Sequence, residues 1–369
     1  MKVGVLGLGN AGFDLHLPAL AGLPDVTVMA ADSDQPRRER AARRYSIPVF
    51  ESLDALLKDG APDVVVVATP PQSHLAVCRR AFEGGAHVLC EKPFAPSIAD
   101  AQAIVDAAAG AGRRVALNHE FREMTIFRAL LDQIGQPEVG DLVFAQAWQN
   151  MDLPPWKEPG WRGQLLTGTL YEAGLHLVDY VIALFGEKPV AVSATMSTCG
   201  VRPEASDAVA LVTFEFSRGR LAQVVQNRLC PGETQYFEVR ADTRLASLRA
   251  SFGGRARVSA GLYRSTKPHF RLELGASGMA WRERGHVRTP LARNPKEPAM
   301  AATRALTRKT LDAFAAGTAP PVTGEEGRDV LEVLAACYRA AELGRRVTLD
   351  EKDLIAAVTF GAATARPGI

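Results

Sequence analysis

The chain has 369 residues, of which 47% are hydrophobic and 23% charged, a composition typical of a globular protein with two domains. Its 43 Lys and Arg residues nearly balance its 41 Asp and Glu residues, so the net charge of +2 provides no basic field for binding nucleic acid. The five cysteines are scattered and form no CxxC pair, which argues against a disulfide framework or a metal site and favours a reducing compartment.

The N-terminal residues, Met1 to Val5, begin a strand pattern directly, without an apolar signal region before it. No apolar run approaches the length of about 18 residues that a membrane span requires. We therefore expect a cytoplasmic protein with no membrane partner, and a small molecule rather than nucleic acid as its ligand.

The first predicted strand, Lys2 to Leu6, is followed by a glycine-rich turn, Gly7 to Gly12, and by a helix over Phe13 to Leu23. In a GxGxxG turn the first glycine permits the tight bend, the second lets the backbone approach a pyrophosphate, and the third allows the helix to pack closely. The next strand, Val26 to Ala31, ends at Asp32, where an acidic residue binds the ribose hydroxyls. The predicted dinucleotide site contains Gly7, Gly9, Asn10, Ala11, Gly12 and Asp32.

Asp32 favours NAD over NADP, because its carboxylate would repel the 2′-phosphate of NADP. Arg37 and Arg38 follow closely and offer that phosphate a partner, although the arginine-rich run that continues to Arg44 also fits the solvated face of a helix. We expect NAD as the cofactor, with Arg37 beside it, and keep NADP as an alternative.

Strands and helices continue to alternate. A weak strand near Pro48 to Phe50 and a helix over Ser52 to Lys58 precede the apolar run Asp63 to Ala68, which is typical of a parallel strand buried between helix layers. A helix capped by Ser97 and a strand over Arg114 to Leu117 complete a six-stranded pattern. The pattern predicts a doubly wound Rossmann domain over residues 1–122.

Two strand ends in this domain carry further candidates. Ligands of open α/β sheets bind outside the carboxyl ends of the strands. Thr69, Pro70 and His74 are therefore predicted to line the cofactor, unless the prolines only form a turn and the neighbouring serine only caps a helix. The strand Ala86 to Leu89 leads into Cys90-Glu91-Lys92-Pro93, so Glu91 and Lys92 are predicted to face the cofactor. For this motif alone, a solvated lysine at a strand end is the alternative.

Beyond Arg122 the hydrophobic pattern changes to alternation. Asp207 to Phe216 places Ala208, Ala210, Val212, Phe214 and Phe216 on one face. Similar alternation is found in Lys188 to Met196, Arg220 to Gln226, Gln235 to Ala241 and His269 to Leu274. The pattern predicts a large antiparallel sheet with one covered and one more open face. The open face suits either a wall of the substrate cleft or the interface of a homo-oligomer, a dimer or tetramer, which is the commoner outcome.

A helix from Gly168 to Phe185 carries Glu172 and His176 four residues apart and Asp179 three residues further on, so all three side chains project from one helical face. Gly174 costs about 1 kcal/mol relative to alanine inside a helix, which indicates a close approach to the backbone there. A surface Glu-His pair is the alternative interpretation.

The rest of the chain reads as two amphipathic helices, Ala299 to Gly317 and Glu325 to Leu343, and a short helix or strand from Asp350 to Ala363. We therefore expect a second α+β domain over residues 123–350, with helices on one side of its sheet, and a loosely held tail over residues 351–369.

Taken together, the motifs resemble those of the glucose-fructose oxidoreductase / inositol dehydrogenase / MocA family. The resemblance rests on the glycine turn with Asp32, on Ala68-Thr69-Pro70-Pro71 with His74, on Glu91-Lys92-Pro93, and on the GxLxExGxHxxD pattern from Gly168 to Asp179. It implies a Rossmann domain followed by an α+β domain with a large open-faced sheet.

The resemblance also implies hydride transfer between NAD(P) and a secondary alcohol or ketone of a sugar, cyclitol or related polyol. Lys92 and His176 match the catalytic residues of the family, and Glu172 is predicted as a third catalytic residue, at a position where the family usually has aspartate. Histidine, with an unperturbed pKa of about 6.5, can accept the hydroxyl proton, and lysine can stabilise the developing negative charge. Substrate contacts are expected from Asn118, Arg122, Trp156, Trp161, Arg162 and Asp179.

Two alternatives to this function remain open from the sequence. The first is a redox-neutral enzyme that retains its NAD, as in glycoside cleavage or epimerisation, and the second is a non-catalytic dinucleotide sensor. The sensor is less favoured, because a lysine, a histidine and a carboxylate all stand at catalytic positions.

Overall fold

The computed structural model of the chain describes residues 1–360 except 155–156, 158–159, 166, 202–206, 233–236, 253–255, 262–268 and 275–277. These residues form two compact units. The first comprises residues 1–123, 299–332 and 356–360, and the second comprises residues 124–298 and 333–355.

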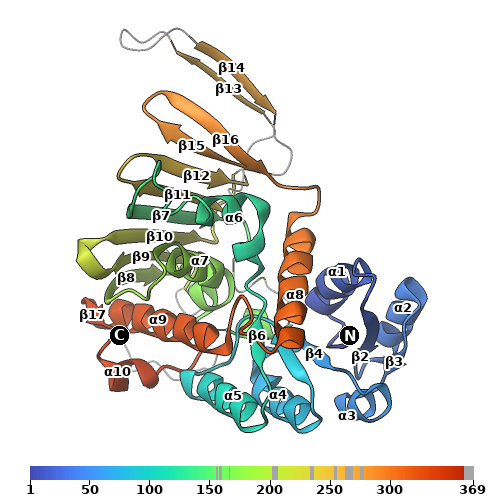
Figure 1. The fold of residues 1–369 in the computed structure, drawn as a ribbon. Helices are drawn as coiled ribbons and strands as arrows, with labels where there is room; N and C mark the ends of the chain where they lie inside the picture. The colour runs from blue at the N-terminus through green and yellow to red at the C-terminus, as the bar shows by residue number, and fades with distance from the viewer. Residues whose placement is uncertain are drawn as a thin grey trace. The chain divides into compact units, whose positions relative to one another are not determined.

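The first unit is built on a six-stranded parallel sheet in the order β3-β2-β1-β4-β5-β6 (Figure 1). Its strands are β1 Lys2–Leu6, β2 Thr27–Ala31, β3 Val49–Phe50, β4 Val64–Val67, β5 His87–Cys90 and β6 Val115–Leu117. The order reverses direction between β1 and β4, as in dinucleotide-binding sheets. The predicted doubly wound fold is confirmed.

The helices of this unit are α1 Leu17–Ala21, α2 Gln35–Tyr45, α3 Leu53–Ala55, α4 His74–Glu83, α5 Ile98–Gly110, α8 Pro298–Ala316 and the first part of α9 Gly324–Leu343. Two stretches expected as regular helix contain π-helical turns, Ala11–His16 and Leu56–Gly60, and 3₁₀ turns occupy Pro71–Ser73 and Glu120–Glu123. Every residue of β4 is buried, because helices cover both faces of the sheet.

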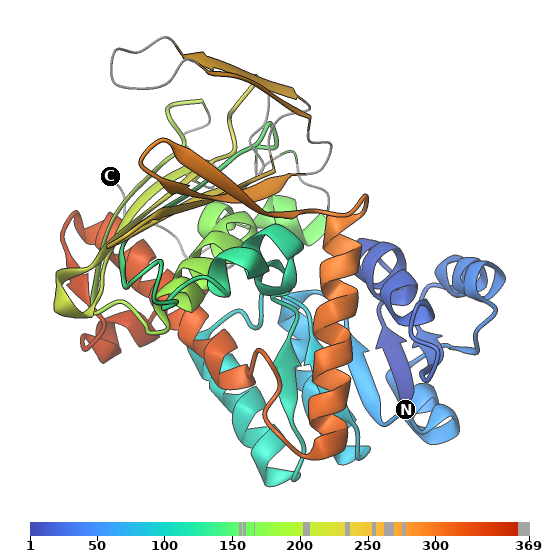
Figure 2. The same cartoon turned by 45° about the horizontal axis from the view of Figure 1, so that its top comes forward.

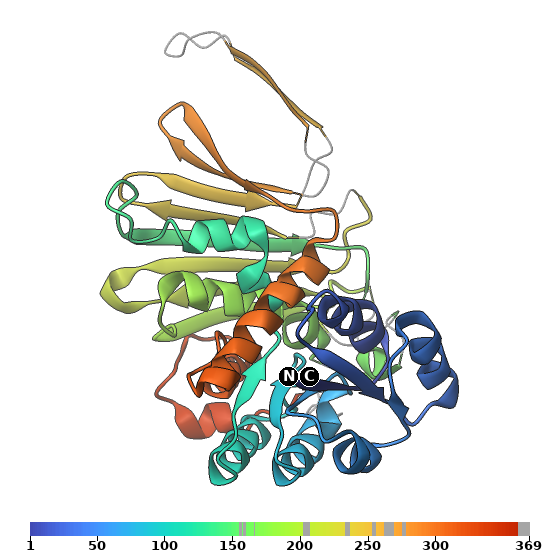
Figure 3. The same ribbon diagram turned by 45° about the vertical axis from the view of Figure 1, so that its right-hand side comes forward.

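Helix α8 belongs to the first unit, whereas the sequence pattern led us to place it in the second domain. Its Leu311 and Phe314 join the core cluster that contains Val3 of β1, and Arg304 donates hydrogen bonds to the carbonyl oxygens of Pro18 and Ala19 in α1. Figure 3 shows helix α8 next to α1. Residues 356–360, expected in the tail, also belong to this unit. The difference arises because an amphipathic pattern indicates that a helix is packed and does not indicate which sheet it covers.

The second unit is built on a nine-stranded sheet in the order β16-β15-β12-β11-β7-β10-β9-β8-β17, which is antiparallel except where β7 pairs with β10. Its strands are β7 Leu142–Asn150, β8 Ala191–Ser197, β9 Val209–Glu215, β10 Leu221–Asn227, β11 Glu238–Thr243, β12 Ser247–Ser251, β15 Met279–Arg284, β16 Val287–Arg293 and β17 Val347–Thr348. A separate two-stranded sheet pairs β13 Ala256–Gly261 with β14 His269–Leu274.

Helices α6 Thr125–Leu131 and α7 Leu175–Phe185 lie on one face of this sheet (Figure 2). The other helical segments are 3₁₀ turns at Gly160–Gln164 and Ser217–Gly219, a π-helical turn at Thr169–Gly174, the second part of α9, and α10 Lys352–Ala356. The residues of β9 and its flanks that were expected on the covered face, Ala208, Ala210, Val212, Phe214 and Phe216, are all buried. The covered face predicted from the alternation is therefore confirmed.

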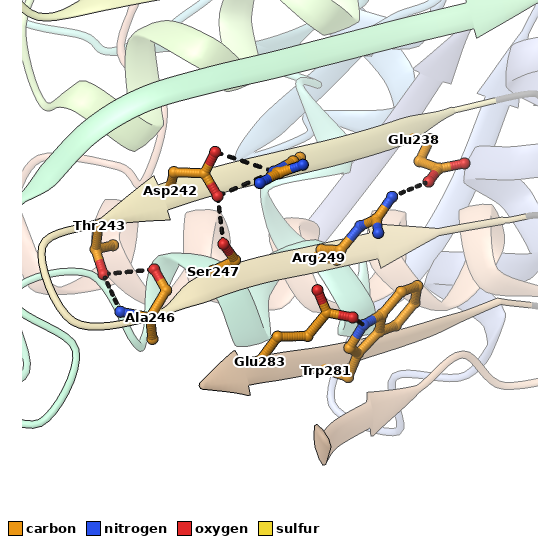
Figure 4. A network of polar contacts seen from close by, with 9 residues as sticks. Glu238, Asp242, Thr243, Ala246, Ser247, Arg249, Trp281 and Glu283 are labelled. Atoms are coloured by element: carbon orange, nitrogen blue, oxygen red, sulfur yellow. Dashed lines mark hydrogen bonds and ion pairs between the residues drawn. The ribbon is translucent and has the colours of Figure 1, made fainter. Parts of the chain in front are cut away.

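The opposite face of the sheet carries polar contacts within and between strands (Figure 4). Arg249 of β12 pairs with Glu238 of β11 at 3.4 Å, and Nε1 of Trp281 donates to Oε1 of Glu283 at 2.8 Å. The Arg249 guanidinium lies 5.6 Å from the centroid of the Trp281 ring. Trp281 is only 4% exposed as a result of such neighbours, although it points away from the covered face.

Candidate functional site

The turn between β1 and the π-helical turn Ala11–His16 requires glycine at two positions. Gly7 has a φ of 92°, and a Cβ there would lie 2.7 Å from the carbonyl oxygen of Ala68. A Cβ at Gly12 would lie 1.8 Å from the carbonyl oxygen of Gly7, so glycine alone lets the first helical turn pack this closely. At Gly9 no described atom lies within 4 Å of the Cβ position, which leaves its backbone open to a ligand. Cofactor contact by this turn, including exposed Asn10 and half-buried Ala11, stays a prediction.

Asp32 lies beside this turn, at the carboxyl end of β2. Its Oδ2 accepts a hydrogen bond of 2.6 Å from the backbone N–H of Leu8, and its Oδ1 accepts one of 2.8 Å from the N–H of Asp34. The guanidinium of Arg37 lies 3.7 Å from the same carboxylate, with the arginine side chain 54% exposed. The carboxylate is therefore fixed by the backbone, while the Arg37 side chain lies beside it at the surface.

His74 joins two loops at the carboxyl edge of the sheet. Its Nδ1 lies 3.0 Å from the carbonyl oxygen of Phe94, and its Nε2 lies 2.8 Å from the carbonyl oxygen of Thr69. Burial lowers the pKa of His74 below its ordinary value, so one of these nitrogens donates and the ring is neutral at physiological pH. The side chain is fully buried, whereas Thr69 is half-buried and Pro70 exposed. Of the three residues predicted to line the cofactor, His74 thus joins the loops that contain Thr69 and Phe94, while Thr69 and Pro70 lie nearer to the protein surface.

Glu91 and Lys92 follow β5 at the same edge. Oε1 of Glu91 lies 2.7 Å from Nε2 of His16 and accepts a hydrogen bond of 2.7 Å from Nδ2 of Asn118, while Oε2 accepts one of 3.1 Å from the backbone N–H of Lys92. Glu91 is 7% exposed and Lys92 is half-buried. A buried carboxylate with these donors is held in one orientation beside the lysine.

Asn118 and Arg122, both expected to contact substrate, are buried in the first unit. Asn118 is fully buried and its amide binds Glu91. The guanidinium of Arg122 lies 2.7 Å from Oε1 of Glu326 in α9. These contacts give both residues a partner within their own unit, and their contact with substrate stays a prediction.

Glu172 and His176 lie in the second unit, at the junction of the π-helical turn Thr169–Gly174 with α7. Glu172, His176 and Asp179 are 8%, 5% and 0% exposed, so the face they share is buried and not a solvated helix surface. A Cβ at Gly174 would lie 2.8 Å from Cδ2 of Leu170, which is the close approach that a glycine within a helix indicated.

Two arginines flank the carboxylate of Glu172. Nε of Arg162 donates to its Oε1 at 2.9 Å, and a terminal nitrogen of Arg228 lies 3.8 Å from its Oε2. Arg162 also lies over the ring of Trp161, 4.9 Å from the centroid. Both residues were expected to contact substrate, and that contact stays a prediction. Trp156 lies outside the described residues.

Sequence reasoning missed His16 and Arg228. His16 is a fully buried histidine at the end of the π-helical turn Ala11–His16, and Arg228, 1% exposed, follows the strand β10 on its covered face. Both residues could have been noticed in the sequence, because each is a polar residue at a position that the hydrophobic periodicity assigns to the interior. Such a residue needs a buried partner, and the partner is remote in sequence.

Metal ligands and membrane spans were searched within the described ranges. No group of three or more His, Cys, Asp or Glu side chains there is arranged to hold a metal ion. In the same part of the chain, none of the helices combines the length and the apolar character of a membrane span.

Comparison with known proteins identifies both parts of the chain. Residues 1–119 match the oxidoreductase family with an NAD-binding Rossmann fold, and residues 127–245 match the GFO/IDH/MocA C-terminal domain. The two matches fall on the Rossmann sheet and on the beginning of the second unit.

An uncharacterized oxidoreductase of Schizosaccharomyces pombe is 31% identical over 209 residues, which cover 54% of this chain and 55% of the relative. The chain thus spans about half the length of the first curated relatives that it matches. Longer matches include D-xylose 1-dehydrogenase (NADP+) 2 of Haloferax volcanii, 27% identical over 95% of this chain and 100% of the relative. scyllo-Inositol 2-dehydrogenase (NADP+) IolW of Bacillus subtilis is 25% identical over 95% of this chain and 96% of the relative.

Among solved structures, an oxidoreductase from Agrobacterium radiobacter in complex with NAD+, L-tartaric acid and magnesium superposes with a TM-score of 0.79. The match covers 95% of this chain and 99% of that one at 18% identity, so the likeness concerns the fold. With both of its parts matched by the corresponding domains, the chain belongs to the glucose-fructose oxidoreductase / inositol dehydrogenase / MocA family of oxidoreductases.

Proposed function

We propose that the protein is an NAD(P)-dependent oxidoreductase that transfers hydride between nicotinamide and a secondary alcohol or ketone of a sugar, cyclitol or related polyol. The observation that carries the proposal is the arrangement at the carboxyl edge of the parallel sheet. There the glycine turn, the backbone-bound carboxylate of Asp32 and the Glu91-Lys92 segment lie at the ends of β1, β2 and β5. The sugar and inositol dehydrogenases among the relatives support the substrate class.

In this proposal Lys92 and His176 form the acid-base pair. During oxidation a hydroxyl proton moves to His176 as hydride leaves the carbinol carbon for the nicotinamide, and the Lys92 ammonium stabilises the negative charge that develops on the oxygen. The reverse direction returns the proton to the alkoxide. Glu172, held between two arginines, is proposed to orient His176 or a substrate hydroxyl.

We propose NAD as the preferred nucleotide. Bound NAD would present its ribose hydroxyls to Asp32. The carboxylate of Asp32 already accepts a hydrogen bond from the backbone N–H of Leu8 in the glycine turn. A 2′-phosphate would meet the same negative charge at close range, and Arg37 and Arg38, which lie beside Asp32, are the groups that could offset it. The NADP+-dependent relatives keep NADP as the alternative.

The open face of the second unit's sheet is proposed as the interface of a homo-oligomer, a dimer or a tetramer. On β9 and β10 this face carries Leu211 and Leu221, which are 47% and 41% exposed, beside a hollow of about 310 Å³ lined in part by Thr195 and Thr213. Light scattering should give more than one chain mass. A Leu211→Glu, Leu221→Glu double variant should shift the mass toward one chain, and a monomeric parent protein would refute the interface.

A cytoplasmic location remains a prediction from the scattered cysteines.

The experiment that tests the function is a panel of sugars, cyclitols and keto-sugars, followed by nicotinamide absorbance with NAD and with NADP. Turnover of at least one polyol, with a higher kcat/KM for NAD, is the expected result. Activity without net change in nicotinamide absorbance would favour the redox-neutral alternative. Absence of turnover across the whole panel with both nucleotides would refute the proposal.

A further inference from the structure

Two glutamines are neighbours on the covered face of the second unit's sheet. Gln149 of β7 and Gln226 of β10 are partners in the parallel register of these strands, one residue before each strand ends. Their side chains are buried, with 1% and 0% of the residue exposed. Arg228, two residues beyond Gln226 on the same face, lies 3.8 Å from Oε2 of Glu172. The two amides are therefore next to the cluster that holds Glu172.

The segment that joins Glu172 to His176 covers one of these amides. A Cβ placed on Gly174 would lie 3.5 Å from Oε1 of Gln226. Gly174 ends the π-helical turn that contains Glu172, and His176 follows two residues later in α7. The amide of Gln226 is therefore placed between strand β10 and the segment that carries two of the residues proposed for chemistry.

The protein itself does not satisfy these amides. Oε1 and Nε2 of Gln226 and Oε1 of Gln149 have no hydrogen-bond partner among the residues that the structure describes. A buried polar atom without a partner destabilises a fold, and the few that native proteins keep are often satisfied by a water or a bound group. A third group is therefore needed to complete the hydrogen bonds of this pair.

The opposite face of the same strands shows that glutamines in this register can bond to each other. Gln146 and Gln223 are also register partners of β7 and β10, and Nε2 of Gln146 donates to Oε1 of Gln223 at 3.1 Å. The register of the two strands is continuous from one pair to the other, so strand geometry does not explain the difference. The buried pair differs from this exposed-face pair in leaving its amide atoms open.

The atoms left open indicate the chemistry of the missing group. Nε2 of Gln226 needs an acceptor, and the two Oε1 atoms of the pair need donors. A carboxylate or a phosphate only accepts hydrogen bonds and an ammonium only donates them, whereas a hydroxyl group does both. The amides carry no charge to attract an ion, so the pair suits a neutral ligand with hydroxyl groups.

We propose that Gln149 and Gln226 are specificity-determining residues that bind a non-reacting hydroxyl group of the substrate. The substrate is then a polyol with at least one hydroxyl beyond the one that takes part in hydride transfer. This inference rests on the proposed function. A retained water would offer the same chemistry, and the first measurement below separates the two sources.

The first measurement is the stability of the full-length protein without ligand. Gln149→Met and Gln226→Met each replace an amide by an apolar group of similar shape. Because no protein bond is lost and an unsatisfied amide is removed, the urea midpoint of each variant should equal or exceed that of the parent. A lower midpoint in both variants would show that the protein or a retained water already binds the amides, and would overturn the proposal.

The second measurement is polyol binding, followed as the rise in unfolding temperature at saturating NAD. The probes are D-glucose, D-xylose, D-fructose and myo-inositol, and at least one should stabilise the parent protein. Gln226→Met should raise the apparent Kd for that probe about tenfold and leave the Kd for NAD within about twofold, since one set of hydrogen bonds to the polyol is lost. Gln146→Met, on the opposite face, is the matched control and should keep both constants.

Two results in the binding measurement would overturn the proposal: no stabilisation of the parent by any probe, or an equal Kd in Gln226→Met and the parent. In an active protein, the parent should also discriminate against the monodeoxy analogue that lacks the bound hydroxyl, and Gln226→Met should lose most of that discrimination. Equal discrimination in both proteins for every monodeoxy analogue would contradict the contact.

The failure of this inference is distinguishable from the failure of the proposed function, because binding is measured without turnover. A probe that stabilises the parent and loses this effect in Gln226→Met, with no turnover by the parent, would support the amide site and refute the oxidoreductase. Turnover by the parent with an unchanged polyol KM in Gln226→Met would support the oxidoreductase and refute the amide site.

Discussion

Two polar clusters, one in each unit, hold the residues proposed for chemistry, and they are built in different ways. At the carboxyl edge of the parallel sheet, Asp32 is held by backbone N–H groups, and Glu91 by a backbone N–H and two short side-chain contacts. At the start of α7, Glu172 is held between the guanidinium groups of Arg162 and Arg228. The first cluster depends mainly on the course of the main chain, and the second on long side chains from separate segments.

This difference has consequences for substitution. A carboxylate bound by backbone N–H groups keeps its place when neighbouring side chains change, because the strand ends position the donors. A carboxylate bound by arginines depends on each of them, and the loss of a buried partner leaves an unpaired charge. We therefore expect the second cluster to be the more sensitive to single changes in its surroundings.

The largest expected effect comes from removing the proposed acid-base pair. Lys92→Ala and His176→Ala should each lower kcat by about 10²- to 10⁴-fold on any polyol that the parent protein turns over, since each group acts on the same oxygen. Steady-state kinetics by nicotinamide absorbance measures this. Exposed Lys58→Ala serves as the control and should retain full activity. If only one of the two variants loses activity, the two clusters do not share one reaction.

The two arginines provide the second test. Arg228→Leu should lower the free energy of unfolding by about 3 kcal/mol, because the guanidinium is 1% exposed and its loss leaves Glu172 with one partner fewer. Arg162→Leu, with a side chain 34% exposed, should cost about 1 kcal/mol or less. Urea unfolding of the two variants side by side measures the difference, and equal losses would contradict a cluster that depends on its buried partner.

The next largest expected effect is on the preference for NAD over NADP. Asp32→Ser removes the carboxylate that we propose for the ribose hydroxyls, so the Kd for NAD should rise about tenfold and that for NADP should fall. Titration followed by fluorescence gives both constants. Asp34→Ser, which removes a neighbouring carboxylate 44% exposed, is the matched control and should change the two constants little. A Kd for NAD that Asp32→Ser does not alter would contradict the proposed ribose contact.

The smallest expected effect concerns acid stability. The folded protein lowers the pKa of Glu91 below its ordinary value of 4.5, so this group contributes stability that is complete above pH 4.5 and is lost as the pH falls through the folded value. Glu91→Gln should remove that contribution, and the difference in unfolding free energy between parent and variant should shrink on acidification below pH 4.5. A difference that grows on acidification would contradict the direction of the shift.

The Rossmann unit was largely predictable from sequence, because its signals are local. The glycine turn, Asp32 and the apolar run of β4 each require only a short stretch of chain, and parallel strands bring their carboxyl ends to one edge. The residues that contact these groups were harder to predict from the sequence. His16 reaches Glu91 through a π-helical turn, and hydrophobic periodicity gives no sign of the extra residue that such a turn contains.

The second unit was predictable in its covered face and not in its polar contacts. Alternation identified the buried side of β9, whereas the two arginines around Glu172 come from a loop and from the end of β10. An amphipathic pattern also does not indicate which sheet a helix packs against, so we expected α8 in the second domain, whereas it belongs to the first unit. In each case the missing information was a contact between residues far apart in sequence, which local patterns do not encode.

The central claim is that Lys92 and His176 act on one oxygen next to the nicotinamide. Its most direct test is a crystal structure of the protein with NAD and a polyol that it turns over. The account predicts that Nζ of Lys92 and a ring nitrogen of His176 each lie within about 3.2 Å of the reacting oxygen, which is hydrogen-bond reach. A complex in which the two groups lie more than about 10 Å apart, with the polyol bound productively, would contradict it.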